Sequence, residues 1–201
     1  MKKIMFNDRY GLTRAVIEKR KTMTRRMISG SPLLPADHIE EARYFAGFIQ
    51  IVANDGESLM EVKSRYKVGE IVAVAQSYEQ VYRQGNMDAD DAIIMGLKYD
   101  PGMSNKMFVR ADLMPHQIRI TGVRCERLQD ISEEDCMKEG VYRDYADTEF
   151  PPHEFYDYDG NEANGFNTPR EAYAALIDKV SGKGTWERNP WVIVYEFELV
   201  K

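Results

Sequence analysis

The sequence predicts an α+β domain built around a mixed sheet or a small barrel. Many short segments alternate apolar and polar residues as strands do, whereas capping patterns mark only a few short helices. No strand–helix–strand rhythm with a glycine-rich phosphate loop is present, which disfavours a dinucleotide-binding fold. The chain has 201 residues, of which 43% are hydrophobic and 30% charged, and this composition suits one globular domain.

The first predicted helix begins at a cap formed by Asn7 or Asp8 and ends near Arg20. The segment 21–28 then alternates and contains two β-branched threonines, which indicates an extended conformation. The face that the helix buries is expected to carry Leu12, Ala15, Val16 and Lys19.

The middle of the chain predicts mostly strands. Segments 44–53 and 58–62 flank Asn54-Asp55-Gly56-Glu57, a sequence typical of a hairpin turn. Residues 71–78 are apolar enough for a buried central strand. A short helix is expected at 87–96, and further strands at 108–109, 117–128 and 191–199.

Two capping patterns predict helices in the C-terminal half. Ser132, followed three residues later by Asp135, opens a short helix that ends at Gly140. The second pattern, at residues 168–171, has proline at the first helical position and opens a helix to about Val180.

The charge of the chain is distributed unevenly. The net charge is −6, which argues against a protein that coats nucleic acid nonspecifically. Residues 1–26 hold nine Lys or Arg and two Asp or Glu, a local charge of +7 that leaves −13 for the remainder. A small basic site on an acidic body suits a bounded anionic ligand better than a long polyanion.

Neither a metal site nor a cofactor is expected from the spacing of the ligand-type residues. Cys125 and Cys136 have no second thiol or histidine at metal-ligand spacing, and we interpret them as packing residues. No apolar run approaches the roughly 20 residues that span a bilayer, and the N-terminal segment is too charged for a signal peptide. We therefore expect a cytoplasmic protein without a membrane partner. The histidines are scattered at His38, His116 and His153.

Three stretches together resemble the ASCH domain family, a branch of the PUA-like superfamily. They are Ile17-Glu18-Lys19-Arg20-Lys21-Thr22-Met23-Thr24-Arg25-Arg26, Leu128-Gln129-Asp130-Ile131-Ser132-Glu133-Glu134-Asp135-Cys136-Met137-Lys138-Glu139-Gly140 and Asn189-Pro190-Trp191-Val192-Ile193-Val194-Tyr195-Glu196-Phe197. In particular, the chain is similar to the larger versions common in phage and prophage genomes. The resemblance implies a small β-barrel with flanking short helices, formed by residues 1–201 as a single domain. Insertions are then expected around 29–66, 84–106 and 141–167, the last of which is the least regular stretch.

The resemblance also implies a cleft between barrel and helices that binds RNA or a nucleotide or nucleoside, including modified ones. A small bacterial branch of the family is an amidohydrolase acting on N4-acetylcytidine through a lysine, a threonine and a glutamate. The matching positions are Lys21, Thr24 and Glu139. The chain departs from the family pattern at Lys19, where glycine is common, and at Gln76, where many larger relatives carry glutamate.

The residue chemistry is compatible with this assignment under one condition. Burial near arginines would lower the pKa of Lys21 and let it act as a base towards the Thr24 hydroxyl. In an extended segment their odd separation would place the two side chains on opposite faces, so joint action requires a turn between them. Glu139 ends a helix against the helix dipole and needs a cationic partner, such as Lys21 or Arg26. The alternatives are that Lys21 is a solvated lysine at a helix end, that Thr24 only reflects the strand preference of threonine, and that Glu139 is an exposed glutamate at a helix end.

Four further residues are candidate ligand contacts. Arg25 and Arg26 can hold a phosphate or a base edge through their planar forks, or can instead pair with the acidic region 133–162. Tyr78 can stack on a base at the cleft mouth, or pack in the core. Gln76 is the fourth candidate, at the position where many larger relatives in the resembled family carry glutamate.

Three functions remain open from the sequence. The first is a binding module for RNA or a modified nucleotide or nucleoside, and the second is an amidohydrolase on an acylated cytidine. The third is a phage accessory protein that binds a host protein. Convergence of the Lys21, Thr24 and Glu139 side chains within hydrogen-bond reach in one pocket would favour the enzyme, and wide separation would exclude it. An exposed apolar patch away from that cleft would favour the protein partner.

Overall fold

The computed structural model describes residues 1–28, 38–54, 59–85, 96–146, 153–160 and 165–201. Its central element is a five-stranded sheet in the order β1-β6-β7-β10-β2. β1 pairs parallel with β6 and the other pairs are antiparallel, so the predicted mixed sheet and α+β class are confirmed. The described strands form no closed barrel, and the barrel is therefore not confirmed. The strands are β1 (Lys2–Ile4), β2 (Met23–Met27), β6 (Ile71–Val74), β7 (Gln117–Arg127) and β10 (Trp191–Leu199).

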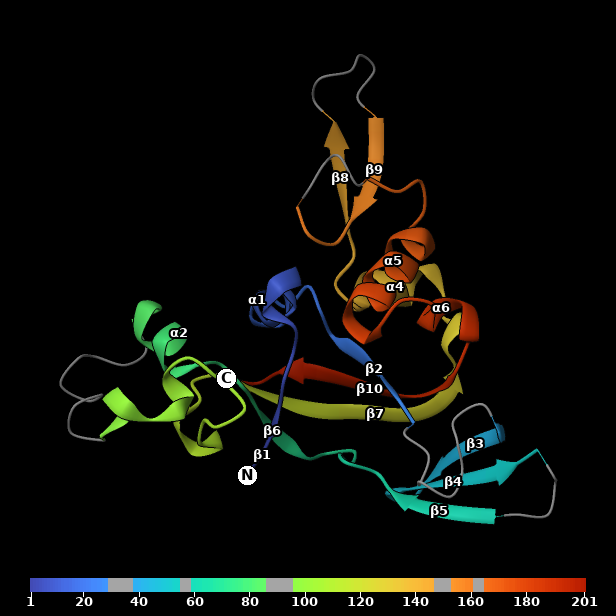
Figure 1. Ribbon diagram of the computed structural model, residues 1–201, viewed down its shortest axis with the longest axis horizontal. Coiled ribbons are helices and arrows are strands. Elements are labelled where there is room, and N and C mark those ends of the chain that lie inside the picture. The colour runs from blue at the N-terminus through green and yellow to red at the C-terminus, as the bar shows by residue number, and fades with distance from the viewer. Residues whose placement is uncertain (29–37, 55–58, 86–95, 147–152, 161–164) are drawn as a thin grey trace.

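Two smaller antiparallel sheets flank the central one (Figure 1). The three-stranded sheet consists of β3 (Ile39–Phe45), β4 (Phe48–Ala53) and β5 (Leu59–Lys63) and lies near the end of β2. The two-stranded sheet consists of β8 (Tyr142–Ala146) and β9 (His153–Asp157) and projects beyond α4 and α5.

The helices are short, as predicted, and three of them cover one face of the central sheet. Figure 1 shows α1 (Leu12–Ile17), α4 (Glu133–Lys138) and α5 (Pro169–Ser181) on the side of β2 and β10. α2 (Tyr78–Arg83) lies at the opposite end from β3–β5, and α6 (Thr185–Arg188) follows α5. Across the residues that the structure describes, no helix is both long and apolar enough to cross a membrane. The 3-10 turns are η1 (Asp8–Tyr10), η3 (Leu97–Tyr99), η4 (Pro101–Met103), η5 (Ala111–Leu113) and η6 (Leu128–Asp130).

The main hydrophobic core lies between the central sheet and these helices. Val72, Val194 and Leu128 are completely buried, and α5 contributes a buried stripe that includes Tyr173 and Leu176. Burying a side chain of this size contributes about 2 kcal/mol, so this packing fixes where α5 lies over β2. The packed position of α5 therefore defines one wall of a cavity above β2.

Several predicted elements are confirmed with small changes of boundary. β7, α4, α5 and β10 match the expected segments. The first helix ends three residues early, at Ile17, because Lys19 adopts a left-handed φ of 61° and turns the chain. The cap at Asn7 opens the η1 turn instead of α1. The helix expected at 87–96 falls almost wholly on residues 86–95, which lie outside the described part of the chain.

Other predictions were wrong in ways that local turns explain. Segment 44–53 is two strands, because Ala46 and Gly47 both have positive φ and form a tight turn. The strand at 71–78 ends at Val74, and Ser77 instead caps α2 through a capping box with Gln80. Residues 108–109 form no strand, and the irregular stretch 141–167 contains the β8–β9 hairpin.

Candidate functional site

Lys21 is held at a junction between α1, α4 and β2. The backbone amides of Arg20 and Lys21 both donate to the Ala15 carbonyl, each at 2.9 Å, so the chain turns there before β2 begins. The amide of Thr22 donates to the Lys138 carbonyl at 3.0 Å and fastens this turn to the end of α4. Lys21 therefore lies outside β2, at the end of a turn that precedes it, and the strand begins two residues later at Met23, so strand alternation does not fix the face of its side chain relative to Thr24.

Glu139 meets Lys21 from the end of α4. The Lys21 Nζ donates to the Glu139 carboxylate Oε2 and to the Glu139 carbonyl oxygen, both at 2.6 Å. The side chains are 2% and 5% exposed, so the pair is buried. Gly140 follows with a φ of 110°, and a Cβ there would lie 3.1 Å from Leu12 Cδ2, which makes glycine necessary for this approach.

Burial sets the proton affinity of Lys21. Loss of water lowers the pKa of the Lys21 ammonium below its usual value, while the charge of Glu139 opposes that change. The positive charges of Arg26 and Arg25 act with burial. The lowered pKa favours the neutral amine form of Lys21, which is a competent base.

Arg25 holds the other side of Glu139 and is fully occupied by acidic partners. Its side chain is 1% exposed, and its NH1 donates to Glu139 Oε1 at 3.1 Å. The remaining nitrogens donate to Glu126 at 2.6 and 2.9 Å and to Asp135 at 3.1 Å. Arg124 also reaches Asp135, at 2.7 Å. Arg25 therefore follows the alternative interpretation of an arginine paired with the acidic region, and it orients Glu139.

A cavity of about 310 Å³ opens above this buried pair, between β2, α1 and α5. Lys21, Thr24 and Glu139 all line it. Thr24 is 5% exposed, and its hydroxyl makes no side-chain hydrogen bond within the described residues. The structure thus brings the three candidate catalytic residues to one hollow. The other walls are largely apolar and come from Phe6, Leu12, Leu176, Ile177 and Val180.

Tyr173 on α5 is a polar cavity residue that the sequence analysis missed. It is 1% exposed, and its hydroxyl has no hydrogen-bond partner in the described part of the chain. Burial, with the negative charge of Glu139, raises the pKa of Tyr173 well above its usual value, so the hydroxyl keeps its proton. An unpaired donor costs about 1–3 kcal/mol when buried, and a ligand carbonyl would satisfy it. In the sequence Tyr173 only continues the apolar stripe of α5, which is why it was not singled out.

Gln76 and Tyr78 are not among the residues that line this cavity. Tyr78 is completely buried at the start of α2, and its hydroxyl accepts a hydrogen bond from the Arg110 amide at 2.9 Å. Gln76 is 1% exposed and donates to Gln84 Oε1 at 2.8 Å, while its own Oε1 lacks a partner among described residues. Their proposed ligand contacts remain predictions that this cavity does not support.

The two cysteines are free thiols. Burial raises the pKa of Cys125 and of Cys136 to about 12, which makes both poor nucleophiles near neutral pH. Within the described ranges, no group of three or more His, Cys, Asp or Glu side chains is placed to hold a metal ion.

An exposed apolar surface lies on the β3–β4–β5 sheet, apart from the cavity. Phe45, Phe48 and Leu59 are 68%, 37% and 69% exposed, and Phe45 pairs with Phe48 across the turn. Such side chains are compatible with the third hypothesis, a protein partner, which stays a prediction.

Comparisons with family models, with curated proteins and with solved structures found no match to this chain. The candidate site therefore stands on its geometry: a buried Lys21–Glu139 pair, the Thr24 hydroxyl and an unpaired Tyr173 hydroxyl around one cavity.

Proposed function

We propose that the cavity binds a nucleobase and that its polar end hydrolyses an amide on that base, as in an N4-acylated cytidine. The observation that carries the proposal is the placement of Lys21, Thr24 and Glu139 on one cavity, with Lys21 and Glu139 in direct contact at 2.6 Å. The apolar walls suit a flat base, and the polar end holds a nucleophile, a base and a hydrogen-bond donor.

The proposed reaction begins at Thr24. Glu139 accepts a proton from Lys21, and the neutral Lys21 amine then removes the proton of the Thr24 hydroxyl as its oxygen attacks the acyl carbon. The C–N bond of the amide breaks, and Lys21 returns that proton to the leaving amino group of the base. Water then hydrolyses the threonine ester and releases the carboxylic acid. In this proposal the Tyr173 hydroxyl, which keeps its proton, donates to the carbonyl oxygen as that oxygen gains negative charge.

The assignment to a PUA-like arrangement is part of this proposal. The first and third motif segments are neighbours, because β2 pairs with β10, and the second meets the first where Thr22 bonds Lys138. These contacts support one site built from all three motifs. Binding of RNA or of a nucleotide without hydrolysis is the broader form of the same proposal, since it uses the same cavity.

The test is incubation with N4-acetylcytidine and related acylated nucleosides, with chromatography of the products. We expect cytidine and acetate from the wild type, a loss of roughly a hundredfold or more in Lys21→Ala, and no loss in Lys138→Ala. Lys138 is a matched control because it is an exposed lysine of α4 paired only with Glu134 and Asp135. Thermal melts separate a folding defect from a chemical one. Absence of turnover of every acylated nucleoside by the wild type would refute hydrolysis and leave binding, which titration with cytidine then tests.

A further inference from the structure

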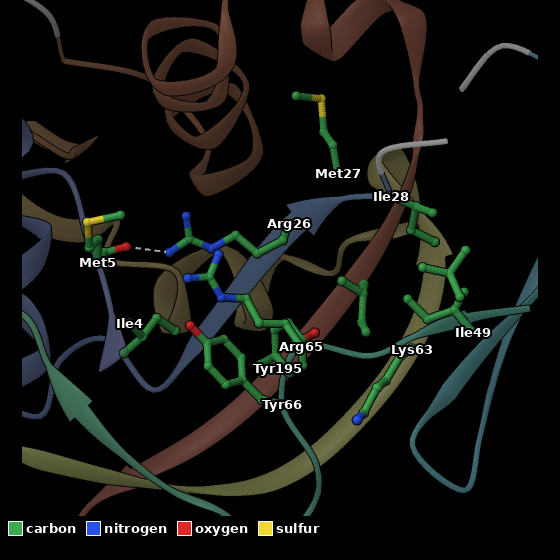
Figure 2. A pocket seen from close by; sticks show the side chains of 12 residues that line it. Ile4, Met5, Arg26, Met27, Ile28, Ile49, Lys63, Arg65, Tyr66 and Tyr195 are labelled. Atoms are coloured by element: carbon green, nitrogen blue, oxygen red, sulfur yellow. Dashed lines mark hydrogen bonds between the residues drawn. The ribbon is translucent and has the colours of Figure 1, made fainter. Parts of the chain in front are cut away.

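A second hollow of about 260 Å³ adjoins the Lys21 cavity at Arg26 and Met27, which line both. Figure 2 shows this hollow: the Arg26 and Arg65 side chains extend towards one another beside the Tyr66 ring. Ile4, Ile28 and Ile49 form part of its apolar wall. We call it the Arg26–Arg65 pocket.

The two arginines of this pocket have no acidic partner in the described part of the chain. Arg26 donates to the Met5 carbonyl at 2.5 Å and lies 5.8 Å from the Phe6 ring centre. Arg65 lies 5.6 Å from the Tyr66 ring centre. Among the described residues that line the pocket there is no Asp or Glu, and Lys63 adds a third cationic side chain. This contrasts with Arg25 and Arg124, whose guanidinium groups contact several carboxylates.

Placing two guanidinium groups together without a carboxylate is unfavourable. Loss of water lowers the pKa of Arg26; the negative charge of Glu139 opposes that change, and the positive charge of Arg65 acts with the loss of water to a smaller extent. The chain has a net charge of −6, so acidic residues that could neutralise the two arginines are plentiful in the sequence. A bound anion relieves the repulsion, and the planar forks of two arginines match the oxygens of a phosphate.

We propose that the Arg26–Arg65 pocket is a phosphate-binding subsite, so that the substrate is a phosphorylated nucleoside whose base occupies the Lys21 cavity. This inference rests on the proposed function and narrows its substrate class from nucleosides to nucleotides. Arg26 and Met27 border both hollows, so the proposed ligand would pass these two side chains to occupy the two. The phosphate comes either from a free nucleotide or from the phosphodiester of an RNA strand, and the shared chemistry is a phosphate ester on the sugar.

The test compares ligands that differ only in phosphate. Titration calorimetry with cytidine, cytidine 5′-monophosphate, a short cytidine-containing RNA and inorganic phosphate is made on wild type, Arg65→Ala and Arg43→Ala. Arg43 is a matched control, since it is an exposed arginine of β3 paired with Glu41 and is not part of the pocket. We expect the wild type and Arg43→Ala to bind a phosphorylated ligand about tenfold or more tightly than cytidine, and Arg65→Ala to lose that preference. Preference for the mononucleotide or for the RNA identifies the source of the phosphate.

Failure of this inference is distinguishable from failure of the hydrolase. Equal binding of cytidine and its phosphorylated forms to the wild type overturns the subsite, as does a preference that survives in Arg65→Ala, or binding of none of the ligands. If acylated nucleosides are hydrolysed and phosphate brings no gain in kcat/KM, the hydrolase stands without the subsite. If nothing is hydrolysed and the Arg65-dependent preference is present, the subsite stands and hydrolysis is refuted.

Discussion

The buried pair of Lys21 and Glu139 is difficult to explain as a source of stability. Removing both charges from water costs several kcal/mol, which their attraction offsets only in good geometry, and apolar replacements are often as stable. Arg25 already supplies Glu139 with a second cationic contact at 3.1 Å. A lysine whose pKa is lowered by burial, and which lines the same cavity as the Thr24 hydroxyl, is better explained by chemistry on a ligand.

The Tyr173 hydroxyl offers a test in which stability and activity move separately. Tyr173→Phe removes an unpaired buried hydroxyl and leaves the ring, so the free energy of unfolding should stay equal or rise by about 1 kcal/mol. Turnover of the acylated nucleoside should fall roughly tenfold or more, chiefly in kcat, because the donor acts on the developing oxyanion. Urea unfolding and steady-state kinetics measure the two effects. Unchanged kinetics would show that Tyr173 only packs.

Lys19 shows how one departure from the family pattern is accommodated. The resemblance places glycine there, and Lys19 indeed adopts a φ of 61°, which glycine takes without strain. Lys19→Gly should therefore raise the free energy of unfolding by about 0.5–1 kcal/mol, whereas Lys19→Ala should not, because alanine has the same strain. Urea denaturation of the three proteins checks this. A destabilised glycine variant would mean that the lysine side chain contributes more than the turn.

At the scale of single residues, the kind of partner that a side chain needs could be predicted from the sequence more easily than the residues that surround a cavity. The helix dipole argument indicated that Glu139 needs a cation, and Lys21 meets it. The exclusion of Tyr78 from the cavity and the inclusion of Tyr173 depend on which side chains face the hollow. The side chains that face the cavity depend on how α5 and α2 pack, and no local sequence pattern predicts this packing.

At the scale of elements, the two caps in the C-terminal half were predicted correctly, whereas the cap of the first helix and the tight turns were not. Ser132 and Thr168 accept hydrogen bonds from the amides of Asp135 and Glu171, as their spacing predicts. The Ala46-Gly47 turn was missed because only one of its two residues is typical of positive φ. Strand β6 was predicted too long because Ala75 and Tyr78 extend its apolar pattern, although Gln76 and Ser77 are polar and the strand ends at Val74.

The cap of α5 matters because that helix carries Tyr173 over the cavity. Thr168→Ala removes the hydroxyl that accepts from the Glu171 amide at 3.2 Å and should cost about 1 kcal/mol of unfolding free energy. Thr168→Ser keeps an acceptor and should cost much less. Chemical denaturation followed by circular dichroism measures both. Equal stability of the two variants would show that Pro169 alone is sufficient to start the helix.

At the scale of the whole molecule, the fold class could be predicted from the sequence, whereas the topology of the sheet could not. Alternating strands and short capped helices were sufficient for the α+β class. Closure of a barrel was not predictable, since it depends on pairing between strands far apart in the chain, such as β1 with β6 and β10 with β2. The site depends on the same long-range order. The chain brings residues 21, 139 and 173 together only after the sheet and its helices have packed.

The most direct measurement of the central claim is the rate of N4-acetylcytidine hydrolysis by Thr24→Val and Thr24→Ser. Valine keeps the branched shape of a buried strand residue and removes only the hydroxyl, while serine keeps the hydroxyl. If Thr24 is the nucleophile, the valine variant should lose roughly a thousandfold or more in kcat with unchanged folding, and the serine variant should retain measurable turnover. Wild-type rates in Thr24→Val would contradict the account.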